Sequence, residues 1–316
     1  MPGGNRPFRF AAQLSRPPQP TAAAWAEQAR RAEGLGYTTL LMPDHFGDQL
    51  APVPALMAAA EATEHLRVGT LVFDNDYRHP LVLAKEAATL DLLSDGRLEL
   101  GMGAGWMRSD YEQSGIAYDP PEIRVDRFEE AVQIVAGLLE AEGPFSFAGR
   151  HYTVTEHTPY PRPVQRPRPP LIIGGGGRRV LTIAARHAEV VSINVNLRQG
   201  TGGAEVAPNA SPEATRRKVG WVREAAGPRF EQIELNCLIG FALVTDDGAQ
   251  MAESLAPAFG IAPEDARHVP LALIGTLDEI EEELRWRRRE YGISYFSVEA
   301  DCWESLAPVV QRLAGT

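Results

Sequence analysis

The sequence predicts a single (β/α)8 barrel, the TIM-barrel form of the α/β class. Two observations support this fold: β-rich segments alternate with longer amphipathic segments along the 316 residues, and the alternation completes eight cycles. A doubly wound open sheet would need fewer strands or a clear break into halves. Residues 143–170 interrupt the alternation, and we interpret them as an insertion between the fourth helix and the fifth strand. Because the alternation then resumes, residues 1–316 are expected to form one domain.

Each predicted strand is a short run of apolar, aromatic and β-branched residues bounded by turn-forming residues. The eight predicted strands are residues 8–14, 38–42, 66–73, 97–102, 171–173, 190–194, 233–244 and 295–298. The predicted helices have apolar residues at helical spacing, and several begin at a capping residue or a proline. They are residues 22–34, 53–62, 79–93, 123–142, 178–187, 212–226, 247–259, 277–291 and 304–313. Residues 145–154 predict a hairpin turned at Ala148 and Gly149, and residues 195–210 predict a flexible loop.

The composition excludes several classes of protein. With 31 Lys and Arg against 42 Asp and Glu, the net charge is −11, which argues against a nucleic-acid partner and against an anionic membrane surface. Cys237 and Cys302 are too few for a disulfide framework or a zinc site, and no His, Asp or Glu cluster has metal-ligand spacing. No apolar run approaches the roughly 18–20 residues of a membrane span, and the N-terminus has no signal-like apolar stretch. We expect a cytoplasmic protein without a metal, which acts on a small molecule.

Four consecutive glycines, Gly174, Gly175, Gly176 and Gly177, follow the fifth predicted strand, and Arg178 begins the next helix. A helix start offers unpaired N–H groups and a positive dipole end, which suit a phosphate, and glycines let a ligand approach the backbone. A tight turn without a ligand is the alternative. The position on the phosphate-binding face of a barrel favours the phosphate site.

Active sites of such barrels lie at the carboxyl ends of the strands, so polar residues there are candidates. His45 follows the second strand and could exchange a proton near neutral pH, although a buried structural histidine is the alternative. Asp44 is a second catalytic candidate, but neighbours on a strand point to opposite faces, so the two need not touch. Gly103 and Gly105 close the fourth strand, where either a flat ligand approaches or the barrel packs tightly.

Three segments resemble the bacterial luciferase-like family. Residues 77–106 contain Tyr-Arg-His-Pro-Leu, Leu-Ser-Asp-Gly-Arg and Leu-Gly-Met-Gly-Ala-Gly-Trp, residues 170–185 contain the glycine run, and residues 275–295 fit the family's C-terminal end. The resemblance covers nearly the whole chain and implies the same barrel. One branch of the family uses reduced FMN with O2, and the other uses coenzyme F420, a deazaflavin that transfers hydride.

The resemblance also implies roles for particular residues. The segment Pro-Asp-His-Phe that contains His45 is similar to the F420 branch, where this histidine lies beside the reactive ring. Residues 70–72 resemble a segment that backs the ring and often carries a cis peptide bond, here expected between Leu71 and Val72. Sugar-phosphate dehydrogenases of this branch carry a glutamate where Trp106 stands, so Trp106 is expected to be a wall for an apolar or aromatic substrate; loop packing is its alternative.

These implications give the expected function: an F420-dependent oxidoreductase that acts on a small organic substrate by C=C or C=N reduction. An FMN-dependent monooxygenase is the alternative, and a barrel without turnover is a third. A homodimer is expected, formed by helices that flank the early strands. The residues expected to bind the cofactor are Thr70, Leu71, Val72, Gly103, Ala104, Gly105, Gly174, Gly175, Gly176, Gly177 and Arg178, and those expected in the substrate pocket are Trp106, Phe46 and Asn194.

Overall fold

A computed structural model, which describes residues 6–201 and 204–316, confirms the closed parallel barrel. The central sheet has the order β3-β2-β1-β13-β10-β9-β8-β5-β4, and an additional pairing of β3 with β5 closes it. β3 and β4 together are the predicted third strand. The barrel strands are β1 (Arg9–Gln13), β2 (Thr39–Met42), β3 (Arg67–Thr70), β4 (Phe73–Asp74), β5 (Leu98–Gly103), β8 (Leu171–Gly175), β9 (Val190–Ile193), β10 (Glu234–Ile239) and β13 (Ile293–Glu299).

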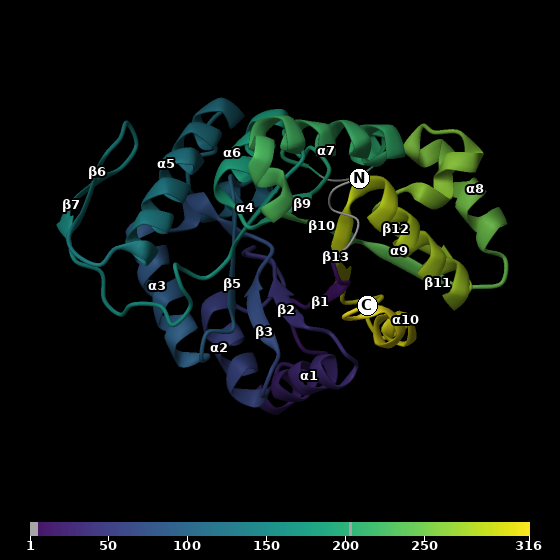
Figure 1. Cartoon of the computed structure of the whole chain (residues 1–316), viewed down its shortest axis with the longest axis horizontal. Helices are drawn as coiled ribbons and strands as arrows, with labels where there is room; N and C mark the ends of the chain where they lie inside the picture. Colours follow the sequence, from purple (N-terminus) through teal and green to yellow (C-terminus); the bar gives the residue numbers. More distant parts are fainter. Residues whose placement is uncertain (1–5, 202–203) are drawn as a thin grey trace.

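Helices surround the strands on all sides (Figure 1). Their starts follow the predicted signals: Thr21 accepts a hydrogen bond from Ala24, and Thr276 forms a reciprocal capping box with Glu279. The helices are α1 (Ala22–Gly34), α2 (Pro52–Ala62), α3 (Pro80–Leu93), α4 (Arg108–Ser114), α5 (Pro121–Glu140), α6 (Arg178–His187), α7 (Pro212–Ala226), α8 (Gly248–Phe259), α9 (Leu277–Tyr291) and α10 (Ala307–Leu313).

The insertion contains the expected hairpin, which lies at the outer edge of the molecule beside α5 (Figure 1). β6 (Phe145–Ala148) pairs antiparallel with β7 (Thr153–His157), so β7 extends beyond the predicted segment. The carboxylate of Glu130, on α5, accepts hydrogen bonds from the N–H groups of Arg150, His151 and Tyr152 at 2.7–3.1 Å. The hairpin turn is therefore tied to α5.

The structure differs from the predicted elements in four places, the first being that the last predicted helix, 304–313, begins only at Ala307. The single strand predicted at 233–244 divides at Gly240, where β11 (Phe241–Val244) leaves the barrel and pairs with the unpredicted β12 (Ala272–Gly275). The apolar run continues through Gly240, so periodicity alone could not show this division. α4 lies between the fourth predicted strand and the fourth predicted helix, and it was not predicted because a seven-residue polar helix has no apolar stripe. A 3₁₀ helix, η2 (Ala204–Ala210), fills part of the loop predicted at 195–210.

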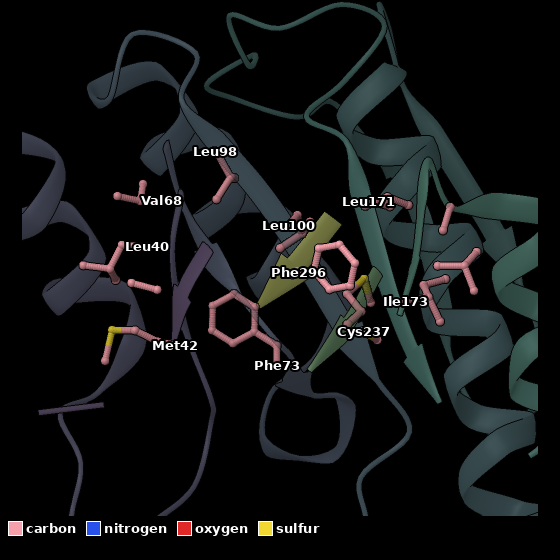
Figure 2. Packing of buried hydrophobic residues seen from close by; sticks show 14 of the residues in the cluster. Leu40, Met42, Val68, Phe73, Leu98, Leu100, Leu171, Ile173, Cys237 and Phe296 are labelled. Carbon is pink, nitrogen blue, oxygen red and sulfur yellow. The ribbon is translucent and has the colours of Figure 1, made fainter. Parts of the chain in front are cut away.

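Alternate residues along the strands face outward toward the helices or inward toward the barrel axis. The outward residues belong to the main hydrophobic core with residues of the helices. Figure 2 shows this packing and labels Leu40, Met42, Val68, Phe73, Leu98, Leu100, Leu171, Ile173, Cys237 and Phe296. A smaller inner cluster fills the middle of the barrel with Ala11, Leu41, Leu71, Ile172, Val190 and Tyr295.

The amino-terminal end of the barrel is closed by a buried charge network. Glu99 accepts hydrogen bonds from Arg67 at 2.7 Å and from the hydroxyl of Tyr295 at 3.0 Å, and it also pairs with Arg9. Arg9 forms a second ion pair with Glu234 at 2.6 Å. Burial alone would lower the pKa of Arg9, but the neighbouring acidic groups raise it above its ordinary value. This network occupies the amino-terminal end of the barrel, opposite the carboxyl ends of the strands.

Candidate active site

A cavity of about 630 Å³ opens at the carboxyl ends of the barrel strands. Each strand of the barrel, from β1 to β13, contributes residues at or just after its carboxyl end. The lining residues from strand ends and the following loops include Gln13, Pro43, Asp44, His45, Leu71, Val72, Asp74, Gly103, Ala104, Gly105, Trp106, Gly174, Gly175, Gly176, Gly177, Asn194, Leu238 and Glu299. The position agrees with the rule for (β/α)8 enzymes.

The glycine run forms one wall of this cavity, together with the first turn of α6. Gly177 is the N-cap of α6 and supplies no side-chain cap, so the N–H groups of the first turn face the cavity without a side-chain acceptor. A Cβ on Gly176 would lie 2.3 Å from the carbonyl carbon of Val195, and a Cβ on Gly177 would meet nothing closer than 3.8 Å. Gly176 is therefore needed for packing, whereas Gly177 leaves open space at the helix start. An anion such as a phosphate fits this space.

Arg178 borders the same wall, but its guanidinium pairs with Glu224 at 3.0 Å and is largely exposed. Arg179 pairs with Asp126 and Glu129 of α5. Both charges are thus compensated by acidic neighbours within the chain. The backbone of the helix start supplies the uncompensated positive potential at this wall.

A second wall is smooth and apolar. The peptide bond between Leu71 and Val72 is cis, which confirms that expectation. The methyl groups of Val72 lie 2.5 Å from the position of a Cβ on Gly103 and 3.4 Å from that of a Cβ on Gly174. The segment Leu71–Val72 thus packs against glycines of β5 and β8, and together they form an apolar surface that suits a flat ring.

Thr70 does not line the cavity, contrary to the expectation that it contacts the cofactor. Its hydroxyl is fully buried and donates to the carbonyl oxygen of Gly101 at 2.8 Å. A Cβ on Gly101 would overlap the carbonyl of Thr70 at 1.9 Å, so β3 and β5 approach each other closely here. Thr70 therefore joins two strands beneath the site.

His45 lines the cavity, and its Nδ1 lies 2.7 Å from Oδ2 of Asp110. Asp110 is 3% exposed, and the hydroxyl of Tyr77 donates to the same carboxylate oxygen at 3.0 Å. The ring of Trp106 meets the imidazole edge-on, with 5.6 Å between ring centroids. Because Asp110 fixes the ring through Nδ1, exchange of a proton with a ligand is left to Nε2.

Asp44 also lines the cavity, but its carboxylate forms no hydrogen bond or ion pair with His45 in the part of the chain that the structure describes. Its carboxylate pairs with Arg78 at 2.7 Å and accepts the N–H of Asp74 at 3.1 Å. The partner of the histidine is Asp110, which comes from the unpredicted α4. The sequence offered no signal for it beyond an acidic residue in the segment that follows the fourth predicted strand.

Asp74 is a buried carboxyl group at the cavity edge. Burial raises its pKa to about 7; the N–H of Asp76 and the hydroxyl of Tyr111 oppose this shift, and the charges of Asp76 and Asp44 add to it. Asp76 itself pairs with Arg127 at 2.8 Å. Asp74 therefore binds a proton near neutral pH.

The other residues expected in the substrate pocket differ in position. Trp106 and Asn194 line the cavity, whereas Phe46 does not: its ring is 48% exposed and packs on Tyr77, with 4.3 Å between centroids. The carbonyl oxygen of Asn194 accepts a hydrogen bond from the buried Nζ of Lys218 at 2.7 Å. Burial lowers the pKa of Lys218 to about 8.

Gln13 and Glu299 are two polar lining residues that sequence analysis did not select. They end β1 and β13, and Nε2 of Gln13 donates to Oε1 of Glu299 at 2.8 Å. Their position at the ends of two predicted strands was the signal that could have identified them.

Residues 5–314 match the family model described as luciferase-like monooxygenase. The chain belongs to this family. The resemblance found in the sequence is thereby confirmed, and the barrel is the fold it implied. Among the described residues, no group of three or more His, Cys, Asp or Glu side chains could hold a metal ion, and no helix is long and apolar enough to cross a membrane.

Relatives of both cofactor types are similar to this luciferase-like chain. The F420-dependent glucose-6-phosphate dehydrogenase of Amycolatopsis mediterranei is 32% identical over 168 residues, which cover 51% of this chain and 50% of that protein. The FMNH(2)-dependent dimethylsulfone monooxygenase of Pseudomonas putida is 29% identical over 143 residues, which cover 45% of this chain and 39% of that protein. The chain thus spans about half the length of the curated relatives it matches, or less.

A solved structure supports the fold along the full chain. The coenzyme F420-dependent tetrahydromethanopterin reductase from Methanopyrus kandleri superposes with a TM-score of 0.76 at 19% identity, covering 98% of this chain and 99% of that one. A flavin-type cofactor is common to these relatives, and the comparisons leave F420 and FMN both represented. The homodimer and the cytoplasmic location remain predictions.

Proposed function

We propose that this luciferase-like protein is an F420-dependent oxidoreductase that transfers hydride between the deazaflavin and a small organic substrate. The observation that carries the proposal is the placement of His45, whose ring lines the cavity and is oriented by the buried carboxylate of Asp110. A C=C or C=N bond that accepts a hydride at one atom needs a proton at the other. An imidazole held at Nδ1 by a carboxylate is suited to give that proton from Nε2.

The walls of the cavity fit the cofactor as well as the reaction. The open space at Gly177 and the uncapped start of α6 would hold a phosphate, and the smooth surface of Val72, Gly103 and Gly174 would receive the tricyclic ring. When bound, the deazaflavin supplies or accepts the hydride. Trp106 and the apolar lining exclude water from the reacting atoms, and His45 holds the proton.

Several relatives support the choice of F420. Proteins named F420-dependent glucose-6-phosphate dehydrogenase are 31–34% identical to about half of this chain. Trp106 stands where the resemblance places a glutamate in those dehydrogenases, so a substrate other than glucose 6-phosphate is proposed. The second candidate is an FMN-dependent monooxygenase, which the family description and the dimethylsulfone monooxygenase favour.

A parallel titration of the purified protein with oxidised F420 and with FMN tests the proposal. We expect saturable binding of F420, and reduction of unsaturated organic substrates by the reduced form without O2 uptake. The His45→Ala variant should bind F420 as tightly as the wild type and lose turnover. Selective binding of FMN together with flavin-dependent O2 consumption would instead establish the monooxygenase.

A further inference from the structure

The part of the cavity formed by β1 and β13 differs in chemistry from the glycine wall. Gln13 and Glu299 are register partners at the ends of these adjacent parallel strands, and both line the cavity. Leu238, at the end of the neighbouring β10, is the next lining residue around the barrel. β1 also lies beside β2, whose end leads to His45. A group bound at Gln13 and Glu299 would therefore belong to a molecule that also reaches the histidine.

Gln13 has a buried acceptor without a partner. Its side chain is 6% exposed, and Nε2 donates to Oε1 of Glu299 at 2.8 Å. Within residues 6–201 and 204–316, Oε1 of Gln13 has no hydrogen-bond partner. Buried polar atoms in native proteins are nearly always satisfied. Because Gln13 is a lining residue of the cavity, a molecule bound there is the available source of the missing donor. The opposite orientation of the amide would place its oxygen against the carboxylate of Glu299, so the orientation in which Nε2 donates to Glu299 is the favourable one.

Glu299 adds a second acceptor that lacks a cation. Among the described residues it takes part in no ion pair, and it accepts hydrogen bonds from Gln13 and from the backbone N–H of Ala300. Burial destabilises the carboxyl group as an anion, and a donor or a positive charge would stabilise it.

The cations of the cavity lie on the other side. The arginines among the lining residues are Arg124, Arg178, Arg179 and Arg198. They come from α5, from the start of α6 and from the segment after β9, whereas the lining side chains at the ends of β1, β10 and β13 are Gln13, Leu238 and Glu299. An anionic group is accommodated at the glycine wall and repelled from the acceptor pair.

We propose that Gln13 and Glu299 form a substrate-recognition site that binds a hydrogen-bond donor, the hydroxyl or protonated amine of an organic substrate. Leu238 and Trp106 line the same cavity and offer apolar contact to the rest of such a molecule. The site therefore selects against substrates with a carboxylate or phosphate at this position. That the bound molecule is a substrate rests on the proposed function. The preference of the site for a hydrogen-bond donor does not, because it is a property of the apoprotein.

Binding of three small probes to the apoprotein, followed by saturation-transfer NMR, tests the site: benzyl alcohol, benzylamine and benzoate. They share one ring and differ in the polar group. We expect the wild type to bind benzyl alcohol and benzylamine, with benzylamine the tighter. Benzoate can bind only at the glycine wall, so its affinity should not depend on Gln13 or Glu299. Gln13→Met keeps the volume of the side chain and should weaken the two donor probes about threefold to tenfold, the usual effect of losing one hydrogen bond. Glu299→Gln should weaken benzylamine more than benzyl alcohol.

Gln133→Met, on the exposed face of α5, is the matched control and should leave all three affinities unchanged. Circular dichroism identifies a variant that fails to fold. If only one of Gln13→Met and Glu299→Gln folds, its affinities alone are enough to test the site. The proposal is overturned if neither donor probe binds to the wild type, if folded variants bind the donor probes like the wild type, or if the substitutions weaken benzoate as much as benzylamine. An F420 titration of the same proteins separates the two proposals. If the wild type does not bind F420, the cofactor assignment is rejected, whereas the result with the three probes still decides the donor site.

Discussion

The side chains of His45 and Asp110 meet at 2.7 Å between Nδ1 and Oδ2, although 65 residues separate them in the sequence. His45 follows β2 and Asp110 lies on α4, which follows β5. β3 lies between β2 and β5 in the barrel wall, so the barrel brings these two loops to the same rim. The carboxylate determines which nitrogen of the imidazole faces the cavity, and this relationship gives the first prediction.

Replacing Asp110 with Asn should reduce kcat of the F420-dependent reaction by roughly 10²-fold, the lower range of general acid–base effects. The neutral amide would no longer stabilise the imidazolium or select its tautomer. The Kd of F420 should stay unchanged, because Asp110 lies outside the ring and phosphate walls. Tyr77→Phe removes the other hydrogen bond to the same carboxylate and should cost less than tenfold. Equal losses of kcat and of cofactor affinity in Asp110→Asn would show a structural role only.

Gly177→Ala tests the phosphate site without disturbing the free protein. A Cβ there has no neighbour within 3.8 Å, and the φ angle of −97° is open to alanine. Thermal stability should therefore remain within a few degrees of the wild type, while the Kd of F420 and of FMN rises at least tenfold because the methyl group occupies the phosphate space.

Gly220→Ala is the control for that variant, since Gly220 lies in α7 and its Cβ would also meet nothing within 4 Å. It should leave cofactor affinity unchanged. Unaltered affinity in Gly177→Ala would place the phosphate elsewhere and would remove the reason for assigning it to the start of α6.

Much of this site was accessible from the sequence because its residues follow predicted strands. The glycine run and His45 were identified by their positions after predicted strands, and the Leu71–Val72 peptide bond by the family resemblance. The structure brings all of them to one cavity. The barrel itself followed from regular alternation, which depends on local patterning that a sequence displays directly.

What could not be predicted depends on side-chain direction and on short polar elements. Thr70 and Phe46 are close to the cavity in sequence, yet one side chain joins two strands and the other packs outside on Tyr77. Asp110 lies on a helix of seven residues without an apolar face, so no periodic pattern marked it. Gln13 was assigned to a strand correctly, but whether the last residue of a strand faces the barrel axis depends on register.

Asp74→Asn should change the dependence of stability on pH. The pKa of about 7 in the folded protein lies above the unfolded value of about 4, so the folded state binds more protons between these pH values. The free energy of unfolding of the wild type therefore falls as pH rises from about 4 to 7, and this loss is absent below pH 4. Asn cannot titrate and still offers an oxygen to the N–H of Asp76. The variant should gain stability relative to the wild type between pH 5 and pH 8.

Urea denaturation at pH 5 and at pH 8 measures the difference in unfolding free energy between Asp74→Asn and the wild type. Asp76→Asn is the control: its carboxylate pairs with Arg127, so that variant should be less stable than the wild type at pH 8. An Asp74→Asn variant with the same relative stability at both pH values would mean that Asp74 titrates near its ordinary pKa.

Trp106 gives the last prediction, because it distinguishes a substrate wall from loop packing. Its ring lines the cavity and stands edge-on to His45, and its carbonyl oxygen accepts a hydrogen bond from Tyr118 at 3.0 Å. The backbone contact survives replacement of the side chain, so Trp106→Ala should fold. Loss of the ring's apolar area should raise KM for aromatic substrates more than tenfold, in line with a burial effect of about 2 kcal/mol, and should leave the Kd of F420 nearly unchanged. Trp106→Phe should restore most of the affinity, because it returns an aromatic face. If Trp106→Ala lowers thermal stability while KM remains constant, the ring serves to pack the loop and the substrate lies elsewhere in the cavity.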